Sequence, residues 1–207
     1  MNLNLEPEMS GIDTLKTGIW LNPPPEWNLD ESVLRLETGS ETDFWRDTLY
    51  GFRRDSGHAL LIPVTGDFTA HLTFDAVYET VYDQAGLMLR RDEGLWLKAG
   101  VEFSDDVANM SVVVTRGASD WSTAVLSGVA GPQRLRLTRL ADAVVVQFRN
   151  AANRWQLLRV ADFPAGATLQ IGPMACSPQR AGFKVRFTEF TIGPAATQAL
   201  HDESPAS

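Results

Sequence analysis

Two neighbouring runs of the sequence, residues 82–90 and 95–103, carry polar and apolar side chains at alternate positions. A period of two places the two sets on opposite faces of a β-strand. If the RDEG stretch at residues 91–94 joins the runs as a hairpin, both polar sets lie on one open face. The side chains predicted to share that face are Tyr82, Gln84, Met88, Arg90, Trp96, Lys98 and Glu102.

An amide, an ammonium, a carboxylate and aromatic rings on one surface suit a polyhydroxyl ligand. Sugar hydroxyls need planar donors and acceptors, and the C–H faces of sugars pack on aromatic rings. The alternative interpretation is a solvated sheet face with ion pairing, for example between Lys98 and Glu102. Periodicity alone leaves both interpretations open.

Two loop-like segments, Thr42–Arg46 and Ser119–Ser122, each place an aspartate close to a tryptophan. Such a pair can flank a sugar, with the aspartate binding hydroxyls and the tryptophan stacking on the ring. The alternative is a tryptophan that covers the end of a sandwich and an aspartate that holds a turn. The candidate ligand-binding residues in these segments are Asp43, Trp45, Asp120 and Trp121.

Two further features have a functional and a structural interpretation. The predicted strand Phe183–Ile192 presents Lys184 and Arg186 on its open face, where Arg186 is a candidate for binding a carboxylated sugar or an ordinary surface cation. Cys176 is the single cysteine, and no histidine spacing nominates a base that would activate it. We therefore predict that Cys176 is buried and structural.

The sequence lacks the usual motifs for metal or cofactor chemistry. It contains no HExxH, CxxC, Walker loop, GxSxG elbow or GxGxxG after a predicted strand. Asp105–Asp106 lacks the ligand series of a calcium loop and predicts a turn. Glycosidases need two placed carboxylates, whereas the 98–103 run offers Glu102 alone. We predict no metal and no cofactor. The single carboxylate in this run argues against a standard glycoside hydrolase.

Composition narrows the class of partner. The 207 residues are 44% hydrophobic and 21% charged, which is typical of a globular protein. Eighteen Lys and Arg against 26 Asp and Glu give a net charge of −8, which argues against binding a phosphate backbone. No apolar run approaches the roughly 20 residues that span a bilayer, and no secretory signal is visible. We therefore expect no nucleic acid and no membrane partner, and a cytoplasmic location.

Period two dominates the whole chain, and no long amphipathic helix is indicated. We predict an all-β fold, a two-sheet antiparallel sandwich or jelly roll, in which residues 1–207 form a single domain. Residues 1–13 and 194–207 lack a strand pattern and are predicted to be loosely held tails. Besides the two runs above, the predicted strands are Val33–Glu37, Phe68–Tyr78, Met110–Arg116, Arg134–Leu140, Ala143–Arg149, Trp155–Val160, Thr168–Gly172 and Phe183–Ile192.

Across residues 16–192 the chain resembles the YesU-like family, also called the regulation-of-enolase family. The resemblance implies a concanavalin A-like lectin/glucanase sandwich with one concave face, but no settled activity. Motif positions that also fall on the predicted open face or its loops are Gln84, Lys98, Glu102, Trp45, Asp120 and Trp121. The matching stretches are Trp20–Pro24, Thr42–Arg46, Tyr50–Phe52, Tyr82–Arg90, Trp96–Phe103, Val113–Arg116, Ser119–Ser122, Met174–Pro178 and Gly182–Phe183.

Three hypotheses for function follow. The first is a lectin-like sandwich that binds a sugar or sugar acid on its concave sheet, with Asp43, Gln84, Lys98, Glu102 and Asp120 holding polar groups and Trp45, Tyr82 and Trp121 stacking. The second is an enzyme acting on a small sugar at the same site, with Glu102 as acid/base tuned by Lys98. The third is a regulatory adaptor that binds another protein, such as a metabolic enzyme.

Overall fold

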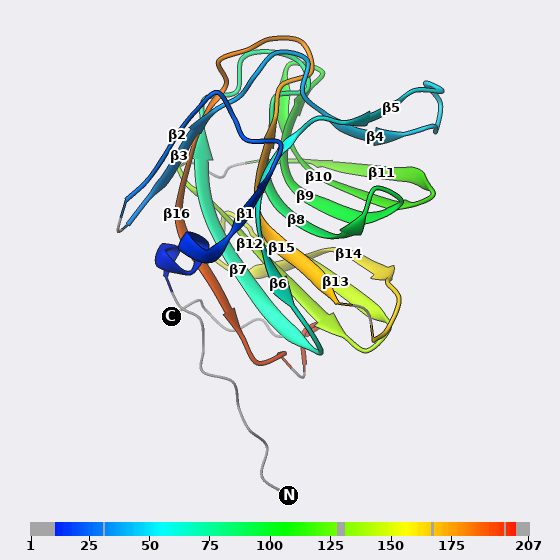
Figure 1. Cartoon of the computed structure of the whole chain (residues 1–207). Coiled ribbons are helices and arrows are strands. Elements are labelled where there is room, and N and C mark those ends of the chain that lie inside the picture. The colour runs from blue at the N-terminus through cyan, green and yellow to red at the C-terminus, as the bar shows by residue number, and fades with distance from the viewer. Residues whose placement is uncertain (1–10, 31, 128–130, 167, 197, 202–207) are drawn as a thin grey trace, which may run out of the picture.

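Two antiparallel sheets pack face to face in a computed structural model that describes residues 11–30, 32–127, 131–166, 168–196 and 198–201 (Figure 1). The first sheet has the order β1 (Ile19–Leu21), β6 (His58–Val64), β15 (Leu169–Cys176), β8 (Gln84–Asp92), β9 (Leu95–Ser104), β10 (Val107–Arg116) and β11 (Ala118–Val125). The second has the order β14 (Trp155–Asp162), β13 (Ala143–Arg149), β12 (Gln133–Leu140), β7 (Phe68–Ala76), β16 (Lys184–Gly193), β3 (Leu34–Glu37) and β2 (Glu26–Leu29). The predicted all-β antiparallel sandwich is therefore confirmed.

The core between the sheets is built from the apolar halves of the alternating runs. Leu87 and Leu97 point inward from β8 and β9 and meet aromatic side chains of the second sheet such as Phe74 and Phe190. A short 3₁₀ helix, η1 (Ile12–Thr17), adds Ile12 to this core. Alternation places every second side chain of each strand on the inner face. The apolar side chains at these positions are removed from water, and this burial stabilises the core.

The outer face of the first sheet differs from the expected open surface. Met88 and Trp96, predicted to lie on it, are fully buried. The cover is a small hairpin of β4 (Phe44–Arg46) and β5 (Arg53–Asp55), which lies above β8–β11 in Figure 1. Period two indicates which side chains share a face, but it does not reveal that a distant segment folds over that face.

Two predicted loops contain strands instead. Thr42–Arg46 contains β4, and Ser119–Ser122 lies within β11, the edge strand of the first sheet. The polar composition of both segments resembles that of a loop because an edge strand and a short hairpin strand remain partly exposed.

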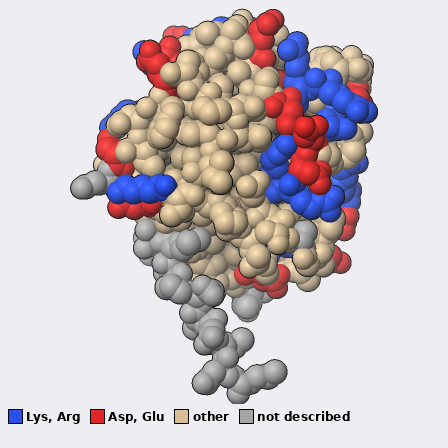
Figure 2. Space-filling view, viewed as in Figure 1, with Lys and Arg blue, Asp and Glu red and all other residues tan. Residues whose placement is uncertain are grey.

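The predicted tails lie only partly within the described residues. Residues 1–10 and 202–207 fall outside them. The described positions make specific contacts, since Ile12 is buried, Ala199 is 2% exposed, and the Ala196 amide donates to Thr69 Oγ1 at 2.9 Å. On the side of the molecule seen in Figure 2, a broad central area carries no charged side chains, and Lys and Arg are interleaved with Asp and Glu along its right-hand edge. None of the described helices has the length and apolar character needed to cross a membrane.

His71 on β7 gives the fold an expected pH dependence. Burial, followed by the charge of Arg136, lowers the pKa of His71 to about 4. The unfolded chain would bind this proton near pH 6.5, so folded-state stability falls as pH drops from about 6.5 to about 4. Glutamine does not titrate in this range, so we expect His71→Gln to lose roughly 1–3 kcal/mol less stability than the wild-type protein over the same drop in pH. Urea unfolding of both proteins at several pH values checks this, and parallel pH profiles would contradict it.

Candidate ligand-binding site

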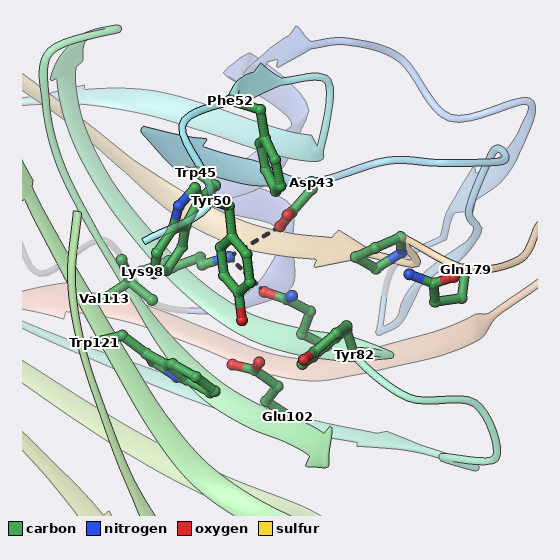
Figure 3. Close-up of a pocket in the computed structure, with 12 residues that line it drawn as sticks. Asp43, Trp45, Tyr50, Phe52, Tyr82, Lys98, Glu102, Val113, Trp121 and Gln179 are labelled. Carbon is green, nitrogen blue, oxygen red and sulfur yellow. Dashed lines mark hydrogen bonds and ion pairs between the residues drawn. The ribbon is translucent and has the colours of Figure 1, made fainter. Parts of the chain in front are cut away.

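A pocket of about 210 Å³ lies between the outer face of the first sheet and the β4–β5 hairpin (Figure 3). Its size is below the roughly 300–1,000 Å³ of drug-sized sites, so it suits a small molecule or one unit of a polymer. Polar groups lie toward the sheet, and aromatic rings form the walls. The lining residues are Asp43, Trp45, Tyr50, Phe52, Tyr82, Gln84, Lys98, Glu102, Val113, Trp121, Pro178 and Gln179.

A second apolar cluster attaches the hairpin to the sheet. Phe44 and Trp45 of β4 pack with Met88, Trp96 and Cys176 of the outer face. The Phe44 and Trp96 ring centroids are 6.0 Å apart. Both rings are removed from water at this contact, and the burial of their apolar surface holds the hairpin against the sheet.

Ion pairs hold both ends of the hairpin. Lys98 Nζ lies 3.3 Å from Asp43 Oδ1, just before β4, and donates to Gln84 Oε1 at 2.6 Å. At the end of β5, Arg90 makes two hydrogen bonds of 2.8 Å to the Asp55 carboxylate. Paired N–H···O bonds between Arg and a carboxylate fix geometry as well as charge. The hairpin is therefore positioned by two cations that project from the sheet.

Glu102 ends a short polar chain at the floor of the pocket. Ser111 Oγ donates to Glu102 Oε2 at 2.7 Å, and Trp121 Nε1 donates to Ser111 Oγ at 3.0 Å. Burial raises the pKa of Glu102 above its usual value, and the charge of Lys98 and the Ser111 hydrogen bond offset this only in part.

Lys98 is 3% exposed and still favours its charged form. Burial opposes that charge, but attraction to the carboxylates of Asp43 and Glu102 outweighs it and holds the pKa of Lys98 above its usual value. The pocket thus contains the charged ammonium of Lys98, which its neighbours stabilise, and the carboxyl of Glu102, whose charged form burial disfavours.

Two glycines allow the strands beneath the pocket to approach each other closely. Gly86 and Gly100 are opposite each other on β8 and β9, one alternate position from Gln84 and Glu102. A Cβ on Gly100 would lie 2.0 Å from the Ala85 carbonyl oxygen, so the close approach of the two strands requires glycine there. Beside Gly100 is a cavity of about 10 Å³, near the lower limit for one water molecule.

Two loops form the rim on the other side. Asp83, which is fully buried, binds Arg180 through Oδ1 at 3.1 Å and Oδ2 at 2.6 Å. This ion pair joins the loop that carries Tyr82 to the loop that carries Gln179. The nearby Tyr50 side chain of the hairpin, followed by burial, raises the pKa of Tyr82. Tyr50 and Tyr82 therefore meet across the mouth of the pocket.

The structure gathers most of the predicted site residues around this pocket. Strand parity explains three of them, since Gln84 is paired with Glu102 across β8 and β9, and Lys98 lies two alternate positions from Glu102 on the same face. The predicted residues that line the pocket are Asp43, Trp45, Tyr82, Gln84, Lys98, Glu102 and Trp121.

Asp120 and Arg186 lie elsewhere, which corrects their predicted place in the site. Asp120 follows the opposite parity from Trp121 on β11, faces away from the pocket and pairs with Arg159 at 3.0 Å. Arg186 belongs to β16 of the second sheet, where it pairs with Asp75 at 3.5 Å. The prediction treated Asp120 as part of a loop, and it assigned Arg186 to an open face without knowing which sheet held it.

Several lining residues were not predicted for the site. Tyr50 and Phe52 come from the hairpin turn, where their rings stack at 5.5 Å between centroids. The available signal was two aromatic residues flanking Gly51, a composition that is unusual for an exposed turn. Val113 lies opposite Trp121 in the β10–β11 pairing and would have followed from that register. Pro178 and Gln179 belong to a loop for which alternation offers no guide.

The described residues contain no group of three or more His, Cys, Asp and Glu side chains placed to hold a metal ion. Cys176 is fully buried in the second apolar cluster, and burial raises the pKa of its thiol. A protonated, inaccessible thiol is a poor nucleophile, so the geometry supports a structural role.

Comparison with known proteins extends over most of the chain. A family described as Protein of unknown function (DUF1349) matches residues 20–195. Regulation of enolase protein 1 of Saccharomyces cerevisiae is 46% identical over 190 residues, which cover 92% of this chain and 96% of that protein.

Solved structures show the same fold. The crystal structure of a functionally unknown protein from Saccharomyces cerevisiae has a TM-score of 0.84 and 45% identity, covering 88% of this chain and 98% of that one. A Bacteroides ovatus chain described as xyloglucan PUL GH43B has a TM-score of 0.64 and 18% identity over 81% of this chain and 34% of its own, a likeness of fold alone. Together with the family match over residues 20–195, these findings establish that the chain belongs to the DUF1349 family and is homologous to yeast Regulation of enolase protein 1.

Proposed function

We propose that the protein binds a sugar in the pocket beneath the β4–β5 hairpin. The observation that carries the proposal is the combination of a polar floor with aromatic walls. Gln84 and Glu102 offer amide and carboxylate groups to hydroxyls, and Trp45 and Trp121 offer ring surfaces to C–H groups. A site with few polar groups set among apolar walls is the usual form of a small-molecule site.

The direct test is calorimetry with a panel of neutral sugars, amino sugars and sugar acids, supported by tryptophan fluorescence. Saturable binding of at least one sugar, lost when the pocket is altered, would support the proposal. Absence of binding across the panel at millimolar concentrations would refute it. Turnover of a bound sugar would change the conclusion from a binding protein to an enzyme that uses Glu102.

Trp121 provides the matched variant for this test. Trp121 is 37% exposed on edge strand β11, so Trp121→Ala should fold. We expect the affinity for the sugar to fall by about 1–3 kcal/mol, the range for a well-packed aromatic contact. The control is Trp27→Ala, because Trp27 lies on β2 of the second sheet, away from the pocket, and is 48% exposed. Equal losses in the two variants would argue against the pocket.

A second candidate is binding of a metabolic enzyme. It rests on the name of the 46%-identical yeast relative, Regulation of enolase protein 1, and on three exposed apolar side chains at the hairpin turn, Leu49, Tyr50 and Phe52. Contiguous exposed apolar groups often mark protein interaction sites. Analytical ultracentrifugation with purified enolase tests this candidate. A complex that is lost in Leu49→Ser would support it, and independent sedimentation of the two proteins would exclude it.

A further inference from the structure

The charged groups that face the pocket are not equally compensated. The Lys98 ammonium has the Asp43 carboxylate at 3.3 Å and the Gln84 amide oxygen at 2.6 Å. Glu102 forms no ion pair with any Lys or Arg of the described residues, and its bonded donor is the neutral hydroxyl of Ser111 at 2.7 Å. The buried carboxylate of Glu102 therefore lacks a direct cationic partner.

Aromatic rings surround that carboxylate. In Figure 3 Trp121 and Tyr82 flank Glu102, and the Tyr50 ring hangs above it from the hairpin. Trp45 continues this wall, with its centroid 5.6 Å from Tyr50 and 6.3 Å from Trp121. Cations are attracted to the faces of such rings, most strongly where water is excluded. A carboxylate among aromatic rings is a site for a positively charged group.

The same geometry is unfavourable for an acid. A ligand carboxylate near Glu102 would meet a like charge in a poorly solvated site. The cation that could attract it, Lys98, is already bound by Asp43, so an acid would have to displace that partner. Burial raises the pKa of Glu102, and a bound ammonium would favour its ionised form.

Resting on the proposed sugar-binding function, we infer that the preferred ligand is an amino sugar whose free ammonium group pairs with Glu102, and that sugar acids are disfavoured. Hydroxyls of the same ring would use Gln84, and its C–H face would pack on Trp121. A neutral sugar satisfies the hydroxyl contacts but leaves the Glu102 charge without a cation.

Three probes with the same ring test this inference: glucosamine, glucose and glucuronic acid, with galactose-series equivalents as a second set. We expect glucosamine to bind roughly 10-fold more tightly than glucose, because hydrogen bonds between charged groups are the stronger ones. Glucuronic acid should bind more weakly than glucose. N-acetylglucosamine, which lacks the positive charge, should lose the advantage of glucosamine.

Glu102→Gln isolates the charge because it keeps the size of the side chain and an acceptor for Ser111. We expect it to remove the preference for glucosamine over glucose. The control is Asp120→Asn, which makes the same change in net charge next to Trp121 but outside the pocket, and it should retain the preference. Thermal unfolding confirms that each variant is folded, and the wild-type ranking decides the matter even if one is not.

The outcomes separate the two proposals. Sugar binding in which glucuronic acid is the tightest, or glucosamine is no tighter than glucose, would overturn the amino-sugar inference and leave the proposed function intact. A glucosamine preference that persists in Glu102→Gln would also overturn it. If no sugar in either series binds the wild-type protein, the proposed function fails and the inference fails with it.

Discussion

Lys98→Met is expected to lower the free energy of unfolding by about 2–4 kcal/mol. Removing one partner of a buried ion pair costs roughly 3–5 kcal/mol, and the value is reduced here because Asp43 keeps some contact with solvent. Methionine is unbranched and one atom shorter than lysine, so it replaces the aliphatic part of the side chain and packing changes little. The loss comes from Asp43, which would keep its charge beneath the hairpin, and from Gln84, whose amide oxygen would lose a donor at 2.6 Å.

A double-mutant cycle provides the control. Asp43→Asn retains an acceptor for the Phe44 amide, which lies 2.8 Å from Asp43 Oδ1, but removes the charge. In the double variant Lys98→Met/Asp43→Asn, neither member of this pair leaves its partner as an unpaired charge, and we expect a loss smaller than the sum of the single losses by about 1–3 kcal/mol. Urea unfolding measures all four proteins. Additive losses would mean that the two side chains act independently and that the ion pair does not hold the hairpin.

The sandwich could be predicted from the sequence because its main strands are long and regular. The runs at residues 82–90 and 95–103 correspond closely to β8 and β9, and their inward side chains, such as Leu87 and Leu97, form the core. Each strand pair adds many contacts of the same kind, so a local pattern is enough to indicate the fold. The same parity brought Gln84, Lys98 and Glu102 to one face.

The cover of the pocket could not be predicted in the same way. β4 and β5 have three residues each, too few for a period to be evident. Their position depends on pairs that are distant in sequence, such as Lys98 with Asp43 and Arg90 with Asp55. Local patterning carries no information about such pairs, and that is why Arg90 and Trp96 were expected on an open surface although both are buried.

Phe44→Ala is expected to release the hairpin and expose Cys176. Phe44 is fully buried in the cluster that attaches the hairpin, and loss of a buried phenylalanine ring lowers stability by about 3–5 kcal/mol. The Phe44 ring and the Cys176 thiol both pack closely against Gly57. A Cβ added to that glycine would be 2.3 Å from Phe44 Cε2 and 2.5 Å from Cys176 Sγ. The thiol of the wild-type protein should therefore react slowly with a small thiol reagent.

The expected result is an increase in the labelling rate of Cys176 of roughly 100- to 4,000-fold, since a loss of about 3–5 kcal/mol raises the open population tenfold for each 1.4 kcal/mol. Phe190→Ala is the matched control, because Phe190 is equally buried but belongs to the core between the sheets. If the hairpin opens as a local unit, Phe44→Ala should accelerate labelling well beyond Phe190→Ala at equal global stability. Equal acceleration would show that Cys176 reacts only after global unfolding, and the hairpin would then be a fixed part of the sandwich and not a separable cover over the ligand pocket.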